Sequence, residues 1–207
     1  MKLTSLSKSV RPLNSATMLS AIVTTAVLSS SLSAIAAPSA DFVGGKTSVT
    51  LSSDFVNALT TLKVTPGIVG SARLKQGVAS FPIVSGAGDL GTVKLEVNHR
   101  GGLSLKAGGT IVELTDYAIT NLDGKPVLTG LVKANASFVG RVPLFNLTST
   151  EEPKITSIHG GNTQIQIKGV GVKLAKPAAD ALNAFFKVTA FKEGLNIGTA
   201  KIDGLAK

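Results

Sequence analysis

A two-residue alternation of apolar and polar side chains between residues 91 and 120 constrains the fold more than any other feature. Apolar and polar residues alternate through Val93–Val97, and a period of two places the apolar ones on one buried face of a β-strand. The same alternation puts His99 on the buried side. Gly101–Gly102 and Gly108–Gly109 interrupt the pattern, and paired glycines accept the positive φ angles of tight turns. The stretch therefore predicts two or three consecutive antiparallel strands.

The apolar phase of this stretch moves by one residue after Thr115–Asp116. Tyr117 and Ile119 become the apolar positions. A phase shift of this kind is typical of a β-bulge or a bend in the strand. We expect Asp116 to have a structural role there, with its side chain bonded to a backbone N–H in the bend.

Strand patterns recur along the rest of the chain, with turn signals between them. The spacing of about 8–12 residues is typical of a β-sandwich or barrel. We predict a mainly β fold, an antiparallel β-sandwich with two short α-helices near the N- and C-termini of the mature chain.

The two helical segments have apolar residues at helical spacing. Ser52–Asp54 offers an N-cap for the first segment, and Pro177 suits the first turn of the second. Each segment follows a short strand, is followed by Lys-Val-Thr, and precedes a Gly-[Ser/Thr]-Ala-[Arg/Lys]-[Leu/Ile] motif. This shared order indicates an internal duplication of residues 49–74 in residues 172–202. Chance similarity between short amphipathic segments is the alternative.

Residues 1–37 have the three parts of a secretory signal peptide. A basic start is followed by an uncharged apolar run over residues 16–28 and by an Ala-x-Ala cleavage site at Ala34–Ala36. The apolar run of about 13 residues is shorter than the roughly 20 that span a bilayer as a helix, which disfavours the alternative, a membrane anchor. We therefore predict an exported protein, periplasmic or extracellular, with no transmembrane segment after the signal is removed.

The predicted mature chain is long enough for one domain with a sizeable core. We expect a flexible lead-in over residues 38–46 and a single domain over residues 47–207. The sequence contains no cysteine, which excludes disulfides, thiol catalysis and thiolate metal sites.

The chain is basic, with a net charge of +9 that falls to about +6 without the three cations of the signal. The lysines are scattered singly, which indicates a solvated basic surface. Attraction to anionic lipid headgroups or acidic polysaccharide is the functional alternative. One tyrosine, no tryptophan and no basic run provide neither a stacking platform nor a phosphate track, so we predict no nucleic-acid binding.

No catalytic motif is present in the sequence. The two histidines, His99 and His159, lie 60 residues apart and could supply at most part of a metal site. A hydrolase would need one of them within reach of a serine and an acid, and no motif indicates this. We therefore predict a non-enzymatic protein with no catalytic residues, although a hydrolase is not excluded.

Residues 48–120 resemble a known family. The run from Gly91-Thr-Val through Asn98-His99-Arg-Gly-Gly-Leu103-Ser-Leu105 is similar to the core of HtaA-type haem-binding domains, which are secreted or surface domains of bacterial haem uptake. Phe81-Pro82 and the amphipathic segment from Asp54 to Leu59 match features that precede this core in the family. The chain also resembles uncharacterised secreted bacterial proteins, which imply no activity.

The resemblance implies antiparallel sheets with two short helices, and a haem iron bound by a tyrosine of the amphipathic segment and supported by the motif histidine. His99 matches that histidine, but Ser53–Lys63 contains no tyrosine, and Tyr117, the one tyrosine of the chain, belongs to a different predicted strand. The candidate ligand-binding residues are His99, Arg100 and Tyr117, with His99 as a haem partner.

The sequence-based hypothesis is a secreted binding or structural protein of the cell envelope or exterior, which recognises its partner through loops at residues 85–91 and 151–161. We expect no cofactor. The alternative is haem or a small apolar ligand near His99. An envelope component, a polysaccharide or a protein could be the partner, and the oligomeric state is left open.

Overall fold

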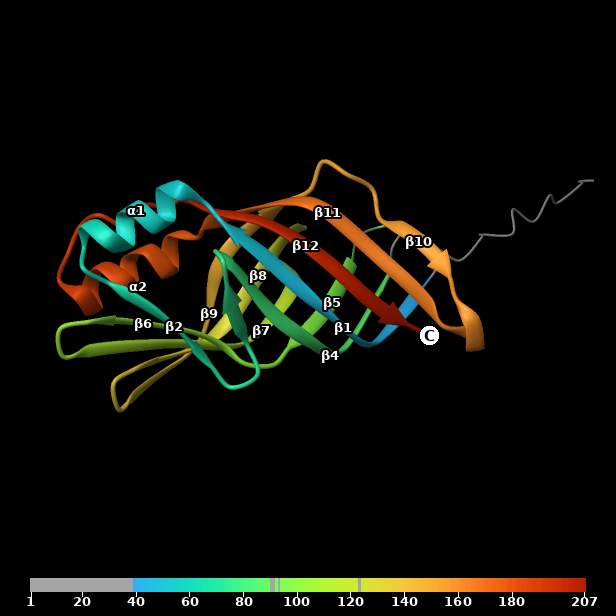
Figure 1. Ribbon diagram of the computed structural model, residues 1–207, viewed down its shortest axis with the longest axis horizontal. Helices are drawn as coiled ribbons and strands as arrows, with labels where there is room; N and C mark the ends of the chain where they lie inside the picture. Colours follow the sequence, from blue (N-terminus) through green and yellow to red (C-terminus); the bar gives the residue numbers. More distant parts are fainter. Residues whose placement is uncertain (1–38, 90–91, 93, 123) are drawn as a thin grey trace, which may run out of the picture. The chain divides into compact units, whose positions relative to one another are not determined.

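The computed structural model describes residues 39–89, 92, 94–122 and 124–207. The predicted signal peptide lies outside these residues. The described part of the chain forms twelve strands, two α-helices and one short 3-10 helix (Figure 1). In chain order they are β1 (Ser39–Leu51), α1 (Ser53–Thr61), β2 (Thr65–Val69), β3 (Arg73–Lys75), β4 (Val78–Asp89), β5 (Lys94–His99), β6 (Gly102–Ala107), β7 (Thr110–Leu122), β8 (Lys125–Ala134), β9 (Ser137–Thr148), β10 (Lys154–Ser157), η1 (His159–Gly161), β11 (Thr163–Leu174), α2 (Lys176–Phe186) and β12 (Asn196–Ala206).

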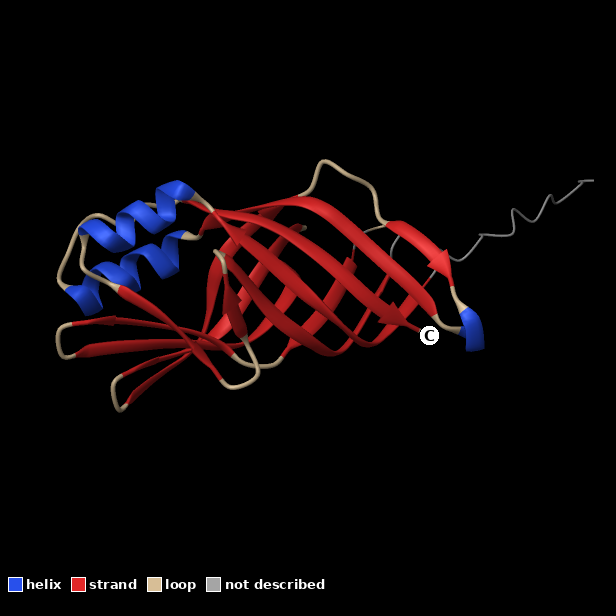
Figure 2. Ribbon diagram, in the orientation of Figure 1, coloured by secondary structure: helices blue, strands red, loops and turns tan. Residues whose placement is uncertain are grey.

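Eight of the strands close into an antiparallel barrel (Figure 2). The order around the barrel is β7-β5-β4-β1-β12-β11-β9-β8, and β8 pairs with β7 to complete the ring. Strands β2 and β6 extend the sheet from β7, β3 pairs with β4, and β10 pairs with β11. The mainly β class and the two helices are confirmed, but the predicted sandwich is wrong. Alternation along a strand is the same in a sandwich and a barrel, and closure depends on pairings between distant strands.

The glycine pair at residues 101–102 bends the chain instead of reversing it, which corrects the predicted turn. Strands β5 and β6 do not form a hairpin with each other, because both pair with the same strand, β7. Gly101 has a φ of +82°, and a side chain at Gly102 would overlap the carbonyl oxygen of Leu114. The reversal occurs at the second glycine pair, Gly108–Gly109, between β6 and β7.

The predicted bulge after Thr115 is confirmed. The pairing of β7 with β8 shifts register between Thr115 and Ala118, and Asp116 has a φ of +49°. The backbone N–H of Asp116 donates to the carbonyl oxygen of Gly101 at 3.0 Å. The bulge thus lies where β5 and β6 meet along β7, and it turns Tyr117 into the barrel.

Both predicted helices are present. Ser52 is the N-cap of α1, and its hydroxyl oxygen accepts the N–H of Phe55 at 3.1 Å. Pro177 stands in the first turn of α2. Each helix follows a barrel strand, β1 or β11, and the two lie side by side beyond one end of the barrel (Figure 1). The segments that follow the two helices differ. After α1 the chain enters β2 at Thr65, whereas the chain between α2 and β12 contains no strand.

Three predicted irregular regions contain regular secondary structure. Residues 39–46, expected to be a flexible lead-in, form the first part of β1 and pair with β4 and β12. Residues 85–89 of the first predicted recognition loop belong to β4. The second, residues 151–161, contains β10 and η1. No helix among the described residues is long and apolar enough to cross a membrane.

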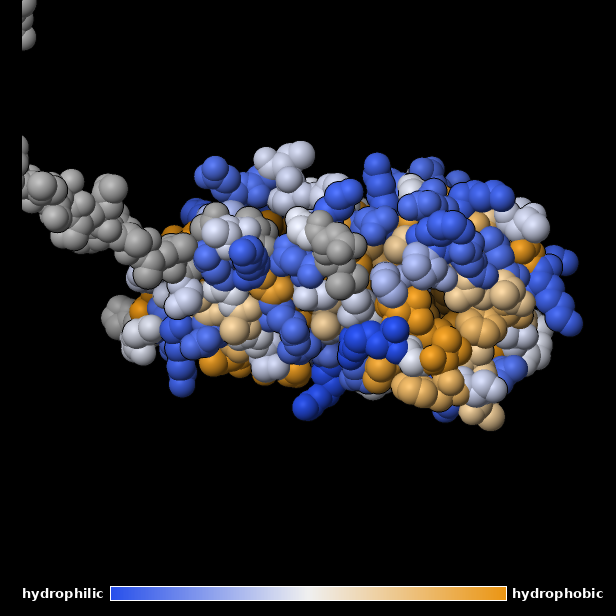
Figure 3. All heavy atoms as spheres, turned by 180° about the vertical axis from the view of Figure 1, so that it is seen from behind, coloured by the Kyte–Doolittle hydropathy of each residue, from blue (hydrophilic) through white to orange (hydrophobic). Residues whose placement is uncertain are grey.

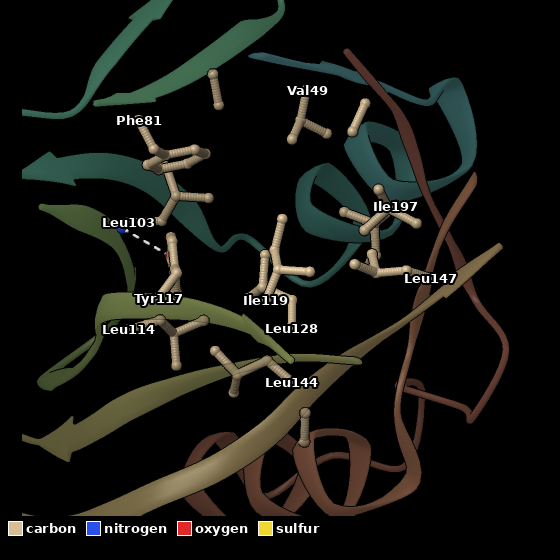
Figure 4. Packing of buried hydrophobic residues seen from close by; sticks show 14 of the residues in the cluster. Val49, Phe81, Leu103, Leu114, Tyr117, Ile119, Leu128, Leu144, Leu147 and Ile197 are labelled. Carbon is tan, nitrogen blue, oxygen red and sulfur yellow. Dashed lines mark hydrogen bonds between the residues drawn. The ribbon is translucent and has the colours of Figure 1, made fainter. Parts of the chain in front are cut away.

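Apolar side chains fill the interior of the barrel (Figure 4). The rings of Phe81 and Tyr117 meet edge to face, with centroids 5.0 Å apart. Beside them a cavity of about 30 Å³ remains, which is room for about two water molecules. The barrel interior is therefore a packed core.

Candidate functional site

An apolar cleft lies between the two helices and the neighbouring end of the barrel. Phe55 of α1 and Leu182 of α2 face strand residues that include Leu105, Val132 and Leu144. Every described side chain that lines the cleft is a hydrocarbon. The remaining lining residues are Leu103, Val112, Leu114, Val142, Phe145, Leu174, Ala178, Ala181, Phe185 and Ile197. Seen from behind, apolar side chains surround a hollow at this end of the molecule (Figure 3).

Backbone hydrogen bonds hold the starts of both helices against the barrel. The N–H of Ser52 donates to the carbonyl oxygen of Ile197 at 2.9 Å, and its hydroxyl donates to the carbonyl oxygen of Asn196 at 2.5 Å. Beside α2, the N–H of Ala175 donates to the carbonyl oxygen of Leu144 at 2.9 Å. Each helix is thus hydrogen-bonded to the barrel at its N-cap. Further along, both helices pack over the cleft through apolar side chains, and Asn183 of α2 is also hydrogen-bonded to Phe191 in the segment that follows the helix.

The cleft is nearly closed by these contacts, since its enclosed volume is about 30 Å³. Pockets for small molecules and cofactors are roughly 300–1,000 Å³. A ligand of cofactor size would therefore enter only if a helix moved away from the strands. The helices start at fixed points and rest on side chains, an arrangement that suits such an opening.

His99, the first predicted site residue, lies inside the barrel and is 4% exposed. Its Nε2 is 2.7 Å from the hydroxyl oxygen of Thr47, and its Nδ1 is 3.3 Å from the carbonyl oxygen of Tyr117. Because a carbonyl only accepts, Nδ1 carries the proton and Nε2 accepts from the threonine. Burial lowers the pKa of His99 from 6.5 to about 4, an effect that hydrogen bonds to backbone groups partly offset. The ring is therefore neutral at pH 7 and connects β5 to β1 and β7.

Tyr117, another predicted site residue, is also buried. Its hydroxyl oxygen accepts the N–H of Leu103 at 3.1 Å (Figure 4), and burial raises the pKa of the phenol above its usual value. His99 contacts the backbone carbonyl of Tyr117, so the two predicted residues are neighbours, but the phenol points elsewhere, towards β6. The hydroxyl of Tyr117 is engaged with protein in this arrangement.

Arg100 lies on the outside of the barrel and is exposed. Its backbone N–H donates to the carbonyl oxygen of Pro82 at 3.0 Å. His159, the second histidine, begins η1. The structure thus brings together His99 and Tyr117 and leaves Arg100, which follows β5, exposed.

The described residues contain no group of three or more His, Asp or Glu side chains that could hold a metal ion. The polar partners of His99 are the hydroxyl of Thr47 and backbone groups, which are not the serine and acid that the hydrolase alternative requires. This histidine is buried, and its ring nitrogens are hydrogen-bonded within the protein.

Comparison with known proteins identifies the fold. No protein-family model matches the chain, and no curated protein matches it by sequence. Among solved structures, the C-terminal domain of HtaA from Corynebacterium glutamicum matches with a TM-score of 0.59 and 12% identity, over 81% of this chain and 99% of that one. The haem-binding protein HtaB from the same organism matches with a TM-score of 0.53 and 11% identity, over 82% of this chain and 96% of that one. The fold is HtaA-like.

A third HtaA-like match is a domain-swapped dimer, the H434A variant of the C-terminal domain of HtaA from the same organism. It has a TM-score of 0.53 and 13% identity, over 74% of this chain and 90% of that one. The resemblance inferred from the sequence is thus confirmed at the level of fold.

The comparison corrects the expectation of no cofactor. One of the proteins with this HtaA-like fold is a haem-binding protein, so haem has to be considered as the ligand. The expectation followed from the lack of a tyrosine in Ser53–Lys63, but the chain, although it lacks that residue, shares its fold with a haem-binding protein.

The described cleft fits one part of haem and not another. Its hydrocarbon walls suit the faces of a porphyrin ring. An axial iron ligand would be a His, Cys, Met or Tyr side chain, and the described lining contains none of these. His99 and Tyr117 are bonded within the barrel. The geometry therefore supports contact with the macrocycle and assigns no residue to the iron.

Sequence reasoning missed the cleft. Its signal was present in the apolar stripes of the two helical segments, at Phe55 and Leu59 and at Ala178 and Leu182. Such a stripe predicts burial of one helix face. It does not identify the strands that face the stripe, which come from the middle of the chain.

Proposed function

We propose that this chain is an exported, non-enzymatic binding protein that holds haem, or an apolar ligand of similar size, in the cleft between its helices and the barrel. The observation that carries this proposal is the hydrocarbon lining of the cleft. The HtaA-like fold, shared with a haem-binding protein, supports it. The binding energy comes from burial of the apolar faces of the ligand.

The described cleft predicts that the metal contributes little to the affinity. Because its lining has no group that could ligate iron, haem and metal-free protoporphyrin should bind with similar affinity. A site in which a protein side chain ligates the iron would instead bind haem much more tightly than protoporphyrin.

The experiment titrates the full-length protein with haemin and, separately, with protoporphyrin IX, and follows absorbance and fluorescence. Two alanines of α2 provide a matched pair of variants, since Ala181 lines the cleft and Ala184 is exposed. We expect saturable one-to-one binding of both porphyrins, about 10-fold weaker in Ala181→Gln, because the amide must be desolvated against the ligand. Ala184→Gln should bind as the wild type does. Absence of saturable binding, or equal effects of the two variants, would overturn the proposal.

A further inference from the structure

The tips of two neighbouring hairpins carry an exposed apolar cluster, which we name the hairpin tip and define as Ile111, Phe138 and Val139. Their exposed fractions are 38%, 68% and 48%. Asn135, in the turn between β8 and β9, joins the two hairpins. Its N–H donates to the carbonyl oxygen of Ile111 at 2.8 Å, and its side-chain oxygen accepts the N–H of Ile111 at 2.8 Å. The three apolar side chains are therefore presented on a backbone that hydrogen bonds hold in place.

Lysines flank the hairpin tip on the paired strands. Lys106 lies opposite Ile111, and Lys133 lies opposite Phe138; both lysines are exposed. Residues opposite each other in an antiparallel pair point to the same face. Lys133 is 3.7 Å from the carboxylate of Glu113 in an exposed ion pair. The free energy of such a pair in water is small.

Two further lysines lie just beyond the helices at the same end of the molecule. Lys63 follows α1, and Lys187 follows α2; both are exposed. Both helices run away from the barrel on the side to which the β6–β7 and β8–β9 hairpins project (Figure 1). This end therefore combines a protruding apolar cluster with four exposed lysines, one of which, Lys133, is paired with the acid Glu113.

We propose that the hairpin tip docks on an anionic lipid surface, with Phe138 and Val139 inserted among the headgroups. Lysines near such a surface attract it, and their long stems let the charge remain in water while the apolar residues insert. A protein partner is less favoured, because three side chains fall well short of the roughly 800 Å² that each side of a stable protein interface buries.

Docking at this end would also place the cleft at the lipid surface. The β8–β9 hairpin carries Phe138 at its tip and lines the cleft with Val132 and Val142. An apolar ligand dissolved in the lipid would then meet the cleft directly. This last step rests on the proposed function, whereas the docking itself does not.

The first experiment is flotation of the full-length protein with vesicles of phosphatidylcholine, with or without 30% phosphatidylglycerol. The double variant Phe138→Ser, Val139→Ser removes the apolar cluster. The matched control is Ile155→Ser, Ile158→Ser, which removes two isoleucines of similar exposure, 47% and 41%, in and beside β10. All proteins carry the same residues 1–38, so that segment contributes equally.

We expect the tip variant to bind anionic vesicles at least about 10-fold more weakly, as loss of one buried aromatic side chain predicts. The control variant should bind as the wild type does. Replacing Lys106 and Lys133 by glutamine should reduce the preference for anionic vesicles about 10-fold or more, since each lysine near the surface contributes about 5-fold. Equal binding by tip and control variants would overturn the proposal. A dimer that the tip variant dissociates would also overturn it, because the tip would then bind a second copy.

A fluorescent reporter keeps the proposal testable if the serine variant fails to fold. The chain has no tryptophan, so Phe138→Trp introduces a single tryptophan at the tip. Anionic vesicles should shift its emission to shorter wavelength and leave that of Ile155→Trp unchanged; a shift in both or in neither would refute docking through the tip. Porphyrin titration of the serine variant without vesicles separates the two proposals, because loss of docking should leave ligand affinity intact.

Discussion

The buried histidine makes the protein sensitive to mild acid, and the effect can be worked out from the structure. Burial lowers the pKa of His99 to about 4 in the folded state, against 6.5 for a histidine in the unfolded chain. Between these two values the unfolded chain binds a proton that the folded chain does not. The contribution of His99 to stability is therefore complete above pH 6.5, falls as the pH falls, and is lost below about pH 4.

The expected magnitude follows from the size of the pKa shift. One pKa unit corresponds to about 1.4 kcal/mol. Lowering the pH from 7.5 to 5.0 should thus reduce the free energy of unfolding by about 2 kcal/mol through His99 alone, and the full loss below pH 4 should be about 3 kcal/mol.

Urea unfolding of the wild type and of His99→Gln at several pH values isolates this effect. Glutamine places an amide nitrogen near the position of Nε2, within reach of Thr47, but has no proton to gain in this range. The difference in unfolding free energy between the two proteins should change by about 2 kcal/mol between pH 7.5 and 5.0. Parallel pH profiles, or an NMR titration that finds the imidazole of His99 protonating near pH 6.5, would refute the reasoning.

Three further substitutions test other contacts by chemical unfolding. Ser52→Ala removes the N-cap of α1 and should cost about 1 kcal/mol; no change would show that the cap is dispensable. Tyr117→Phe leaves the N–H of Leu103 without its acceptor and should cost about 1–3 kcal/mol, whereas unchanged stability would mean that another acceptor replaces the phenol. Gly130→Ala adds a Cβ about 2.6 Å from Leu144 and 2.8 Å from the ring of Tyr117 and should cost about 1–3 kcal/mol by overpacking; a neutral result would show that the core can shift to accept it.

Local features of this fold could be predicted from the sequence because each depends on a short stretch of chain. The bulge after Thr115 is predicted from a shift in the alternation, and the start of α1 from the capping residue Ser52. The burial of His99 is predicted because it lies two residues after Val97 and so on the same face of the strand. In each case one physical rule acts within a few residues.

The closure of the barrel could not be predicted in the same way. It requires β7 to pair with β5 and β6 on one edge and with β8 on the other. Paired glycines signal a change of direction, but Gly101–Gly102 produces a bend and Gly108–Gly109 a reversal. The difference comes from the tertiary partner, since the backbone of β7 lies directly against Gly102.

The role of His99 illustrates the same limit. Alternation correctly indicated an inward side chain, and an inward histidine is compatible with either a ligand site or a structural pair. In the structure the Nε2 atom is bonded to Thr47, which is 52 positions earlier in the chain. No spacing rule connects the two residues, because β1 reaches β5 only through β4.

The cleft and the helices that cover it depend on each other. The strand residues in its floor, such as Leu105 and Val132, are buried because α1 and α2 lie over them. If a helix moved away, these side chains would face water unless another apolar surface replaced the helix. A bound ligand could be that apolar surface. To bind, it would have to replace the apolar contacts between the helix and the strands with contacts of its own. The strength of helix packing then sets the affinity, since the free energy needed to move a helix off the strands is subtracted from what the ligand gains by binding there.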